Sequence, residues 1–472
     1  MGIESMDQGA RVRNFVFARL SRSRAIVLGL IALFLTFYVL SPYDSSLRST
    51  LRWQSTVASD YVQHLHPDDK WLFKEQKYPI DPSQDIAVIV KTGFGTRNRV
   101  PNVLAALGNE TLDNDVLIIQ DYPVNTRKPY ITGNAKTVET VDIISWMVQN
   151  HKLADHGKNE RLMKYEHLVD AIEDEDYFMA DTLAKGYGWE LDAMKFISGL
   201  QYAWEKMPKK KWYVMSDDDT YVIKSSLALA LGHLDYRVPQ YLGNPVGDFL
   251  GRFAHGGSSA VISGATMAKL FDKNPAAVTE AHIESISAVY GDKLLSTTLM
   301  KIGIYLNEDY ARLFNGEPPH MTRMWADRFC LPLVSFHGLG DGDLMEETNE
   351  HFKHMNQPVF WRQLASIYGA ADFQSFVAEP VRVNLDFVGR LDEHSTTVVN
   401  TETLDDCVRI CGDHSTECLA WTWDQFSKTC HYAPWAIIGD HREGFLSGIN
   451  YALAQKLTEG CHGPRSPAAA TE

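Results

Sequence analysis

WYVMSDDDTYVI, residues 212–223, joins a short apolar run to three adjacent aspartates. The first four residues are typical of a buried strand, because they are apolar and rich in aromatic and β-branched side chains. Asp217, Asp218 and Asp219 then follow the strand and would repel one another without a counter-cation. Asp217 and Asp219 could present oxygens to one Mn²⁺ or Mg²⁺. The alternative is a solvated acidic turn without a ligand.

Two similar apolar runs precede this stretch, at residues 85–91 and 116–119. Between them and the aspartates, apolar residues recur at helical spacing over residues 188–207. Strands that alternate with helical segments predict an α/β fold with a parallel sheet. Ligands of such sheets bind at the carboxyl ends of the strands, where both the Thr92-Gly93 turn and the aspartates are expected.

The composition describes an ordinary globular chain of 472 residues, long enough for two or three domains. The net charge of −15 argues against nucleic acid as a partner, since binding a polyanion depends on a basic face. Six cysteines are too few for a disulfide-dense small scaffold. Five of them follow position 400, which suggests a separate C-terminal unit.

The N-terminus has the pattern of a signal anchor. Residues 25–40 carry no charge, and a basic cluster precedes them: Arg11, Arg13, Arg19, Arg22 and Arg24. We expect a cytosolic tail over residues 1–24 and a transmembrane helix over 25–43 that anchors the chain in the Golgi or ER membrane. The rest of the chain would then lie in the lumen. A cleaved signal peptide is one alternative, although its apolar stretch is usually shorter. A buried helix of a soluble protein is the other, although the run is apolar on all sides. A lumenal position would make Asn109 a glycosylation site.

The aspartate stretch resembles the fringe and core 1 β1,3-galactosyltransferase group of glycosyltransferase family 31, especially its fungal members. The resemblance covers about residues 85–340. It includes the Lys91-Thr92-Gly93 turn, the helical segment 189–204 and the segment HGGSSAVIS at 255–263. It implies the GT-A fold of nucleotide-sugar glycosyltransferases, with a catalytic domain over 83–378 behind a stem at 44–82.

The resemblance also implies roles for single residues. His337, in Ser-Phe-His at 335–337, would complete a metal site with Asp217 and Asp219. Asp292 would be the catalytic base, although Gly291 replaces the usual acid before it, and Glu284 is the alternative base. The remaining contacts to the UDP-sugar are implied for Thr92, Gly93, Asp121, Lys195, Asp218, Gly256 and Gly257. An exposed lysine and an ordinary histidine are the simpler interpretations of Lys195 and His337.

These residues together imply an inverting hexosyltransferase that uses Mn²⁺ or Mg²⁺. It would move a sugar, galactose by resemblance, from UDP to a glycan or glycoprotein acceptor through a β1,3-type bond. A transferase for UDP-GlcNAc or UDP-glucose and a non-catalytic lumenal carbohydrate-binding protein remain alternatives. The contiguous aspartates do not resemble the separated carboxylates of a glycosidase. The oligomeric state is open, with a homodimer as one option.

The C-terminal cysteines lie in an aromatic segment, 406–448, that resembles a PAN/apple domain. Family precedent implies the pairs Cys407–Cys430 and Cys411–Cys418, and we pair the two remaining cysteines as Cys330–Cys461. A zinc site is the alternative, but the spacings do not form two CxxC pairs. We expect this unit over 379–460, followed by a flexible tail at 461–472. It either holds the acceptor or only stabilises the chain.

Overall fold

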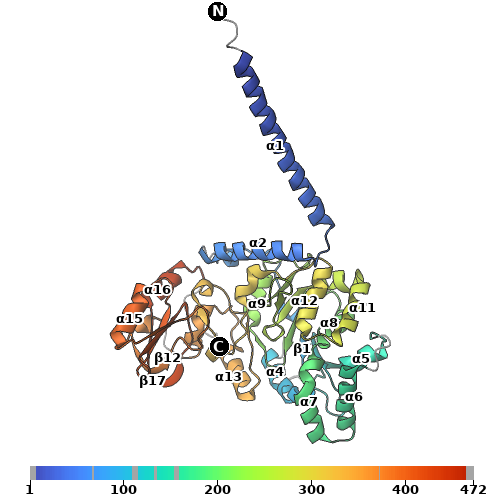
Figure 1. Cartoon of the computed structure of the whole chain (residues 1–472). Coiled ribbons are helices and arrows are strands. Elements are labelled where there is room, and N and C mark those ends of the chain that lie inside the picture. Colours follow the sequence, from blue (N-terminus) through green and yellow to red (C-terminus); the bar gives the residue numbers. More distant parts are fainter. Residues whose placement is uncertain are drawn as a thin grey trace, which may run out of the picture.

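The computed structural model describes residues 7–65, 69–108, 115–131, 136–153, 159–370 and 373–463. These residues form a mixed α/β structure with a largely parallel sheet and a second, antiparallel sheet. The two sheets lie beside each other, and the helix α2 (Ser46–Leu65) crosses above them (Figure 1).

The first sheet has six strands in the order β3-β2-β1-β4-β9-β6. Strands β1 to β4 run parallel, whereas β9 is antiparallel to both of its neighbours. Their bounds are Ile86–Lys91 (β1), Val116–Gln120 (β2), Glu139–Asp142 (β3), Trp212–Asp217 (β4), Tyr241–Gly243 (β6) and Ala260–Ser263 (β9). The parallel sheet and the strands expected at 85–91, 116–119 and 212–215 are therefore confirmed.

Both faces of this sheet are covered, which explains why β1 and β2 are buried along their whole length. Val88 and Val90 face one apolar cluster, while Ala87 and Ile89 face the other. The first cluster includes residues of α4 (Val100–Leu107), α9 (Lys224–Leu231) and α13 (Gly342–Phe352). The second includes residues of α5 (Ile143–Gln149), α6 (Glu160–Glu173), α7 (Tyr177–Asp192), α8 (Lys195–Lys206), α11 (Pro275–Ser285) and α12 (Gly291–Lys301).

The helix expected over 188–207 is two helices. Helix α7 ends at Asp192, and α8 begins at Lys195 after a turn at Ala193 and Met194. The apolar spacing continues through this turn because both helices pack on the same face of the sheet. The periodicity of the sequence therefore does not predict the break between α7 and α8.

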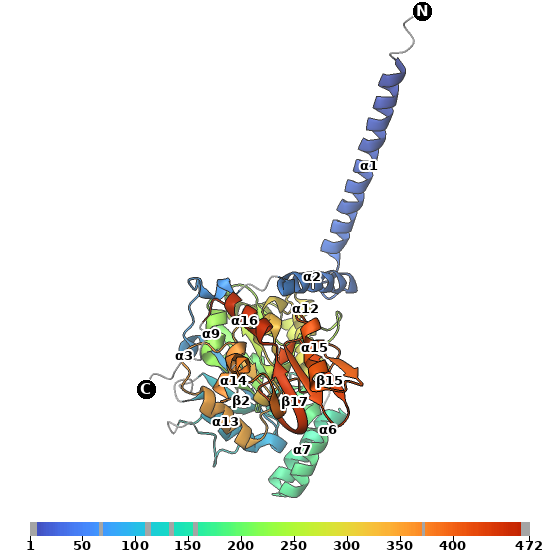
Figure 2. The same ribbon diagram turned by 90° about the vertical axis from the view of Figure 1, so that its left-hand side faces the viewer.

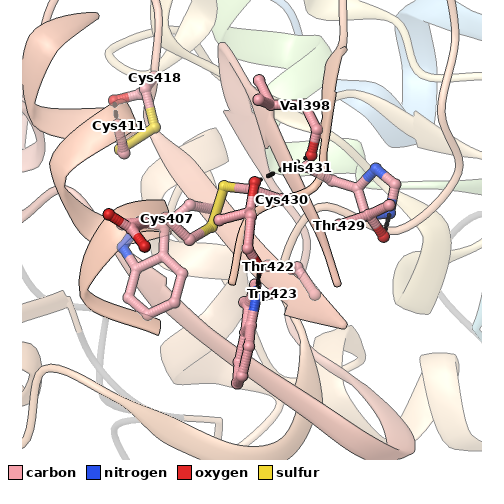
Figure 3. Close-up of a disulfide and its surroundings, with 12 residues drawn as sticks. Val398, Cys407, Cys411, Cys418, Thr422, Trp423, Thr429, Cys430 and His431 are labelled. Carbon is pink, nitrogen blue, oxygen red and sulfur yellow. Dashed lines mark hydrogen bonds between the residues drawn. A yellow bond between two sulfur atoms is a disulfide. The ribbon is translucent and has the colours of Figure 1, made fainter. Parts of the chain in front are cut away.

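The second sheet has five antiparallel strands in the order β12-β17-β14-β15-β13, next to α15 (Leu404–Asp413). Their bounds are Arg382–Asp386 (β12), Thr396–Val399 (β13), Ala420–Asp424 (β14), Thr429–Ala433 (β15) and Asp440–Ile449 (β17). Cys407–Cys430 joins α15 to β15, and Cys411–Cys418 closes the end of that helix (Figure 3). Both disulfides, and Cys330–Cys461, are the pairs that the sequence analysis expected. The PAN/apple assignment stays a prediction.

Short elements connect the two sheets. Strand β10 (Met324–Trp325) pairs with β16 (Trp435–Ala436), and the rings of Trp325 and Trp435 lie 4.5 Å apart. Cys330–Cys461 adds a covalent link across 131 residues of sequence. The other short elements are α3 (Pro82–Asp85), β5 (Tyr221–Val222), β7 (Pro245–Val246), β8 (Phe253–Ala254), α10 (Gly264–Met267), β11 (Ser335–Phe336), α14 (Leu364–Ile367) and α16 (Tyr451–Gly460).

The N-terminal helix α1 (Asp7–Leu40) extends away from the rest of the chain (Figure 2). Among the described helices, none combines the length and the apolarity needed to cross a membrane. This finding overturns the transmembrane helix expected over 25–43. The helix ends at Leu40, so residues 25–40 extend about 24 Å, less than the ~30 Å of a hydrocarbon core.

The expected stem is partly helical, and tertiary contacts hold its helix α2 in place. Arg312 donates to Asp60 at 2.7 Å, and the guanidinium of Arg52 lies 3.8 Å from the ring centre of Tyr305. Arg48 donates to backbone carbonyls of the last turn of α1. The first two contacts hold α2 against residues 305–312, and the third joins it to α1.

Candidate active site

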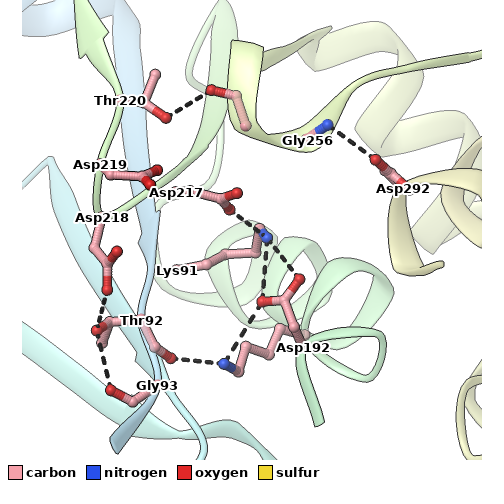
Figure 4. Close-up of polar contacts among 12 residues, drawn as sticks. Lys91, Thr92, Gly93, Asp192, Asp217, Asp218, Asp219, Thr220, Gly256 and Asp292 are labelled. Atoms are coloured by element: carbon pink, nitrogen blue, oxygen red, sulfur yellow. Dashed lines mark hydrogen bonds and ion pairs between the residues drawn. The ribbon is translucent and has the colours of Figure 1, made fainter. Parts of the chain in front are cut away.

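The first of the three aspartates lies at the carboxyl end of β4, directly opposite Lys91 at the end of β1. The Lys91 Nζ is 2.6 Å from Asp217 Oδ1 and 3.0 Å from Asp192 Oδ2 (Figure 4). Burial alone would lower the pKa of Lys91, but these two carboxylates outweigh it and raise that pKa. Lys91 is therefore a buried cation that neutralises part of the aspartate charge.

The second aspartate points toward the β1 turn. Asp218 is buried and accepts a 2.6 Å hydrogen bond from the Thr92 hydroxyl. Burial raises the pKa of Asp218, and the hydrogen bond from Thr92 offsets only part of this effect. Thr92 and Asp218 thus connect two neighbouring strand ends, which is a structural role for both residues.

The third aspartate lies beside His337. Strand β11 pairs with β5, so the residue after β11 lies next to the residues before β5. His337 Nε2 is 3.3 Å from Asp219 Oδ1, and ligand atoms of Asp217, Asp219 and His337 all lie within 4.8 Å of one another. The structure therefore brings together the three residues expected to bind a metal.

The chemistry of this group fits a divalent cation. Two carboxylates and one imidazole are ligands that Mn²⁺ and Mg²⁺ sites use. The Oδ1 atoms of Asp217 and Asp219 are buried, with Lys91 Nζ 2.6 Å from the first and His337 Nε2 3.3 Å from the second. Five carboxylates share three lysine or arginine side chains around them, which leaves a surplus of negative charge.

Asp219 and His337 stabilise each other's charged forms. Burial alone would raise the pKa of Asp219, but His337 and then Arg99 outweigh it and lower that pKa. Burial would likewise lower the pKa of His337, but Asp219 raises it. Neighbouring His255, with its ring centre 5.2 Å from that of His337, has a pKa lowered by burial and by His337.

The two glycines of the segment 255–263 make room for these side chains. A Cβ on Gly257 would lie 2.3 Å from His337 Nε2, so only glycine allows the imidazole to approach. The carbonyl of Gly257 accepts a 2.7 Å hydrogen bond from Thr220. The N–H of Gly256 donates to Asp292 Oδ2 at 3.0 Å, as Figure 4 shows. Both glycines therefore lie at the site.

Asp292 is the carboxylate at the beginning of α12. Burial raises its pKa, while the hydrogen bond from Gly256 lowers it in part. Gly291 precedes it because a Cβ there would lie 2.3 Å from the Phe196 ring and 2.8 Å from the Ala193 carbonyl. A side chain in that position has no room.

The alternative base lies elsewhere. Glu284 forms a 2.8 Å ion pair with Lys301 at the last residue of α12. Nine residues of helix, about 13 Å, separate Lys301 from Asp292. The structure therefore places Asp292, and not Glu284, beside the glycine segment.

Asp121 and Lys195 form a buried ion pair of 2.7 Å, with side chains only 1% and 2% exposed. Lys195 also donates to the Thr92 carbonyl, and Asp121 accepts from the backbone N–H of Phe94. A Cβ on Gly93 would lie 3.2 Å from Asp121, so the turn passes close to this pair. The pair holds the β1 turn in place. The sequence predicted that both side chains contact the UDP-sugar, but in the structure they are buried against each other.

The sequence analysis missed two residues of this site, Arg99 and Asp192. The Arg99 Nη1 lies 3.3 Å from Asp218 and 3.4 Å from Asp219, and its side chain is one third exposed. Arg99 lies eight residues after Lys91, the last residue of β1, and a basic residue at that distance is only a weak signal in the sequence. Asp192 reaches Lys91 only because α7 ends there, which the continuous apolar pattern concealed.

Asn109 lies outside the described residues. No protein-family model matches the chain. No curated protein matches it either.

Proposed function

We propose that the chain is a metal-dependent glycosyltransferase that moves a hexose from a UDP-sugar to an acceptor hydroxyl. The observation that carries the proposal is the convergence of Asp217, Asp219 and His337 at the end of β4. A solvated acidic turn would not place two buried carboxylate oxygens beside an imidazole from a strand more than 100 residues away. The resemblance to glycosyltransferase family 31 supports the same interpretation.

Asp217, Asp219 and His337 would hold the cation. Once bound, a divalent cation would neutralise the charge that develops on the departing UDP. Arg99 supports the same step, because its one-third-exposed guanidinium lies at the aspartates and can form paired hydrogen bonds with phosphate oxygens. Before the donor binds, the positive charge of Lys91 reduces the repulsion between the carboxylates of Asp192 and Asp217.

Asp292 would take the proton from the acceptor hydroxyl as that oxygen attacks the anomeric carbon. Its raised pKa suits a general base, and the Gly256 N–H fixes its orientation. A single base with a stabilised leaving group gives inversion, and hence a β-linkage from an α-linked UDP-sugar. By resemblance, we propose galactose as the sugar and a β1,3-type bond, with UDP-GlcNAc and UDP-glucose as the competing donors.

The proposal is tested by measuring UDP release from UDP-galactose, UDP-GlcNAc and UDP-glucose, each with Mn²⁺ and with a chelator. We expect metal-dependent release with one donor and a loss of about 10²–10⁴-fold in Asp292→Asn. Asp219→Ala should lose both activity and Mn²⁺ affinity. Asp413→Ala is the matched control, because that aspartate is 69% exposed on α15. Release that is unaffected by chelation, or absent with every donor, contradicts the proposal.

A further inference from the structure

We infer that Trp189 and Tyr290 form a binding platform for the acceptor sugar, a hexopyranose ring, beside Asp292. This inference rests on the proposed function, because it names the acceptor subsite of the same reaction. The two rings lie 5.8 Å apart at 90°, in an edge-to-face pair. They come from different helical segments, the last turn of α7 and the residue before α12.

Both aromatic side chains are unusually open to solvent for their size. Trp189 is 60% exposed and Tyr290 is 51% exposed. Single exposed apolar residues are common on proteins, but a contiguous group beside a polar site indicates a binding surface. Val289, next to Tyr290 in the chain, is also exposed.

The platform is attached to the candidate active site from two directions. Trp189 and Asp192 are three residues apart on α7 and therefore lie on the same side of the helix, about 5–6 Å apart at their Cβ atoms. Asp192 contacts Lys91, the lysine that pairs with Asp217. On the other side, Tyr290 is two residues before Asp292.

The backbone between Tyr290 and Asp292 is held in place by close packing. Gly291 lies against the Phe196 ring and the Ala193 carbonyl, where no side chain fits. The backbone positions that carry the Tyr290 ring and the Asp292 carboxylate are thus held in place. A sugar on the aromatic pair would have a defined position relative to the base.

The chemistry of the pair matches a sugar ring. One face of a hexopyranose carries C–H groups and packs on aromatic rings, while its hydroxyls need polar partners. Tyr290 supplies a ring and a hydroxyl, the combination that makes tyrosine common in binding sites with one apolar and one wet end. Asp292 accepts one hydrogen bond from the Gly256 N–H and one from the Lys293 N–H. A carboxylate can accept about four hydrogen bonds, so Asp292 can also accept one from the hydroxyl of the acceptor sugar.

The test measures binding of methyl β-D-galactopyranoside, methyl β-D-glucopyranoside and methyl α-D-mannopyranoside by saturation-transfer NMR on the full chain with UDP and Mn²⁺. We expect at least one glycoside to bind the wild type and about tenfold weaker binding in Trp189→Ala and in Tyr290→Ala. Trp189→Phe, which keeps a ring, should retain most of the affinity. UDP and Mn²⁺ affinity should be the same in all four proteins, which shows that the fold is intact.

Equal glycoside binding in wild type and Trp189→Ala overturns the inference, as does the absence of binding in the wild type. A change from dimer to monomer in Trp189→Ala by analytical ultracentrifugation also overturns it, because the pair would then contact a second copy. UDP release is measured in parallel. Ring-dependent glycoside binding without UDP release from any donor would refute the proposed catalysis and leave the sugar-binding surface standing.

Discussion

The Lys91 Nζ lies 2.6 Å from Asp217 Oδ1, within the group of side chains proposed to bind a metal. The lysine is 1% exposed at its side chain and has a second carboxylate partner, Asp192. A buried cation in this position compensates carboxylates that would otherwise repel one another at the strand ends. It also occupies an oxygen that a metal would use, so Lys91 and the metal compete for the same charge.

We therefore expect Lys91→Met to destabilise the metal-free protein and to make its stability depend on Mn²⁺. Removing one partner of a buried ion pair typically costs about 3–5 kcal/mol. Saturating Mn²⁺ should raise the melting temperature of this variant more than that of the wild type, since the cation replaces the lost charge. Thermal unfolding with and without Mn²⁺ measures both effects.

Lys206→Met is the control for this prediction, because the Lys206 side chain is 52% exposed near the end of α8. It should leave both melting temperatures close to those of the wild type. A Lys91→Met protein whose melting temperature rises with Mn²⁺ no more than the wild type would show that Lys91 and the cation do not compensate the same charge.

Gly257 provides a second test of the metal group. A methyl group at this position would lie 2.3 Å from His337 Nε2 and would displace the imidazole from Asp219. We expect Gly257→Ala to weaken Mn²⁺ binding by about 10–100-fold, the loss typical of residues that orient metal ligands. Isothermal titration with Mn²⁺ measures this change.

The matched substitution is Gly188→Ala on α7, where the added methyl group meets nothing within 4 Å. It should keep the wild-type Mn²⁺ affinity and give a small gain in helix stability. If Gly257→Ala binds Mn²⁺ as tightly as Gly188→Ala does, His337 is not a ligand.

The strands and the position of the aspartates could be predicted because the signal is local. An apolar run of five or six residues buried on both faces leaves a continuous pattern, and the strand end fixes where the next polar residues lie. The proximity of His337 to Asp219 was available only through the family resemblance, because the pairing of β11 with β5 has no signature in two-residue strands.

The roles of Lys195 and Asp121 could not be predicted for a different reason. A helical lysine and an aspartate after a strand have the same local pattern whether they face a ligand or each other. Their burial follows from the path of the β1 turn, which packs against both side chains at Gly93. The end of α1 at Leu40 could not be predicted either, because the sequence does not distinguish residues 41–43, which lie outside the helix, from a continuation of the apolar run.

Asp142, at the end of β3, predicts a pH dependence of stability outside the site. Burial raises its pKa to about 6, despite hydrogen bonds from the Tyr165 hydroxyl and the Ser145 N–H. The folded state therefore binds a proton more tightly than the unfolded chain, whose aspartate pKa is about 3.9. Its stabilising effect is complete below pH 4 and is lost as the pH rises through 6.

We expect Asp142→Asn to remove this contribution while keeping the helix cap of α5 and the side-chain volume. The difference in unfolding free energy between variant and wild type should grow by about 2–3 kcal/mol from pH 4 to pH 7, in favour of the variant. Urea unfolding at several pH values measures it. A constant difference over this range would show that the Asp142 pKa is not raised.

The loop lengths of two of the disulfides predict a ranking of stability losses. In the chain-entropy description, a cross-link stabilises the fold by restricting the unfolded chain, more so for a longer loop. Cys330–Cys461 spans 131 residues, and Cys411–Cys418 spans seven. Replacing both cysteines of the first pair by serine should cost about 5 kcal/mol of unfolding free energy, and of the second about 2.4 kcal/mol.

Urea unfolding of the two double-serine variants, each compared with the wild type, measures the ranking. The longer link also joins the two sheets beside the β10–β16 pairing, so its loss should separate their unfolding into two transitions. The loss of Cys411–Cys418 should leave a single transition, because the longer link is still in place and both of these cysteines pack within the C-terminal cluster. An equal or larger cost for that short loop would mean that local packing in α15, rather than loop length, governs the contribution of the cross-links.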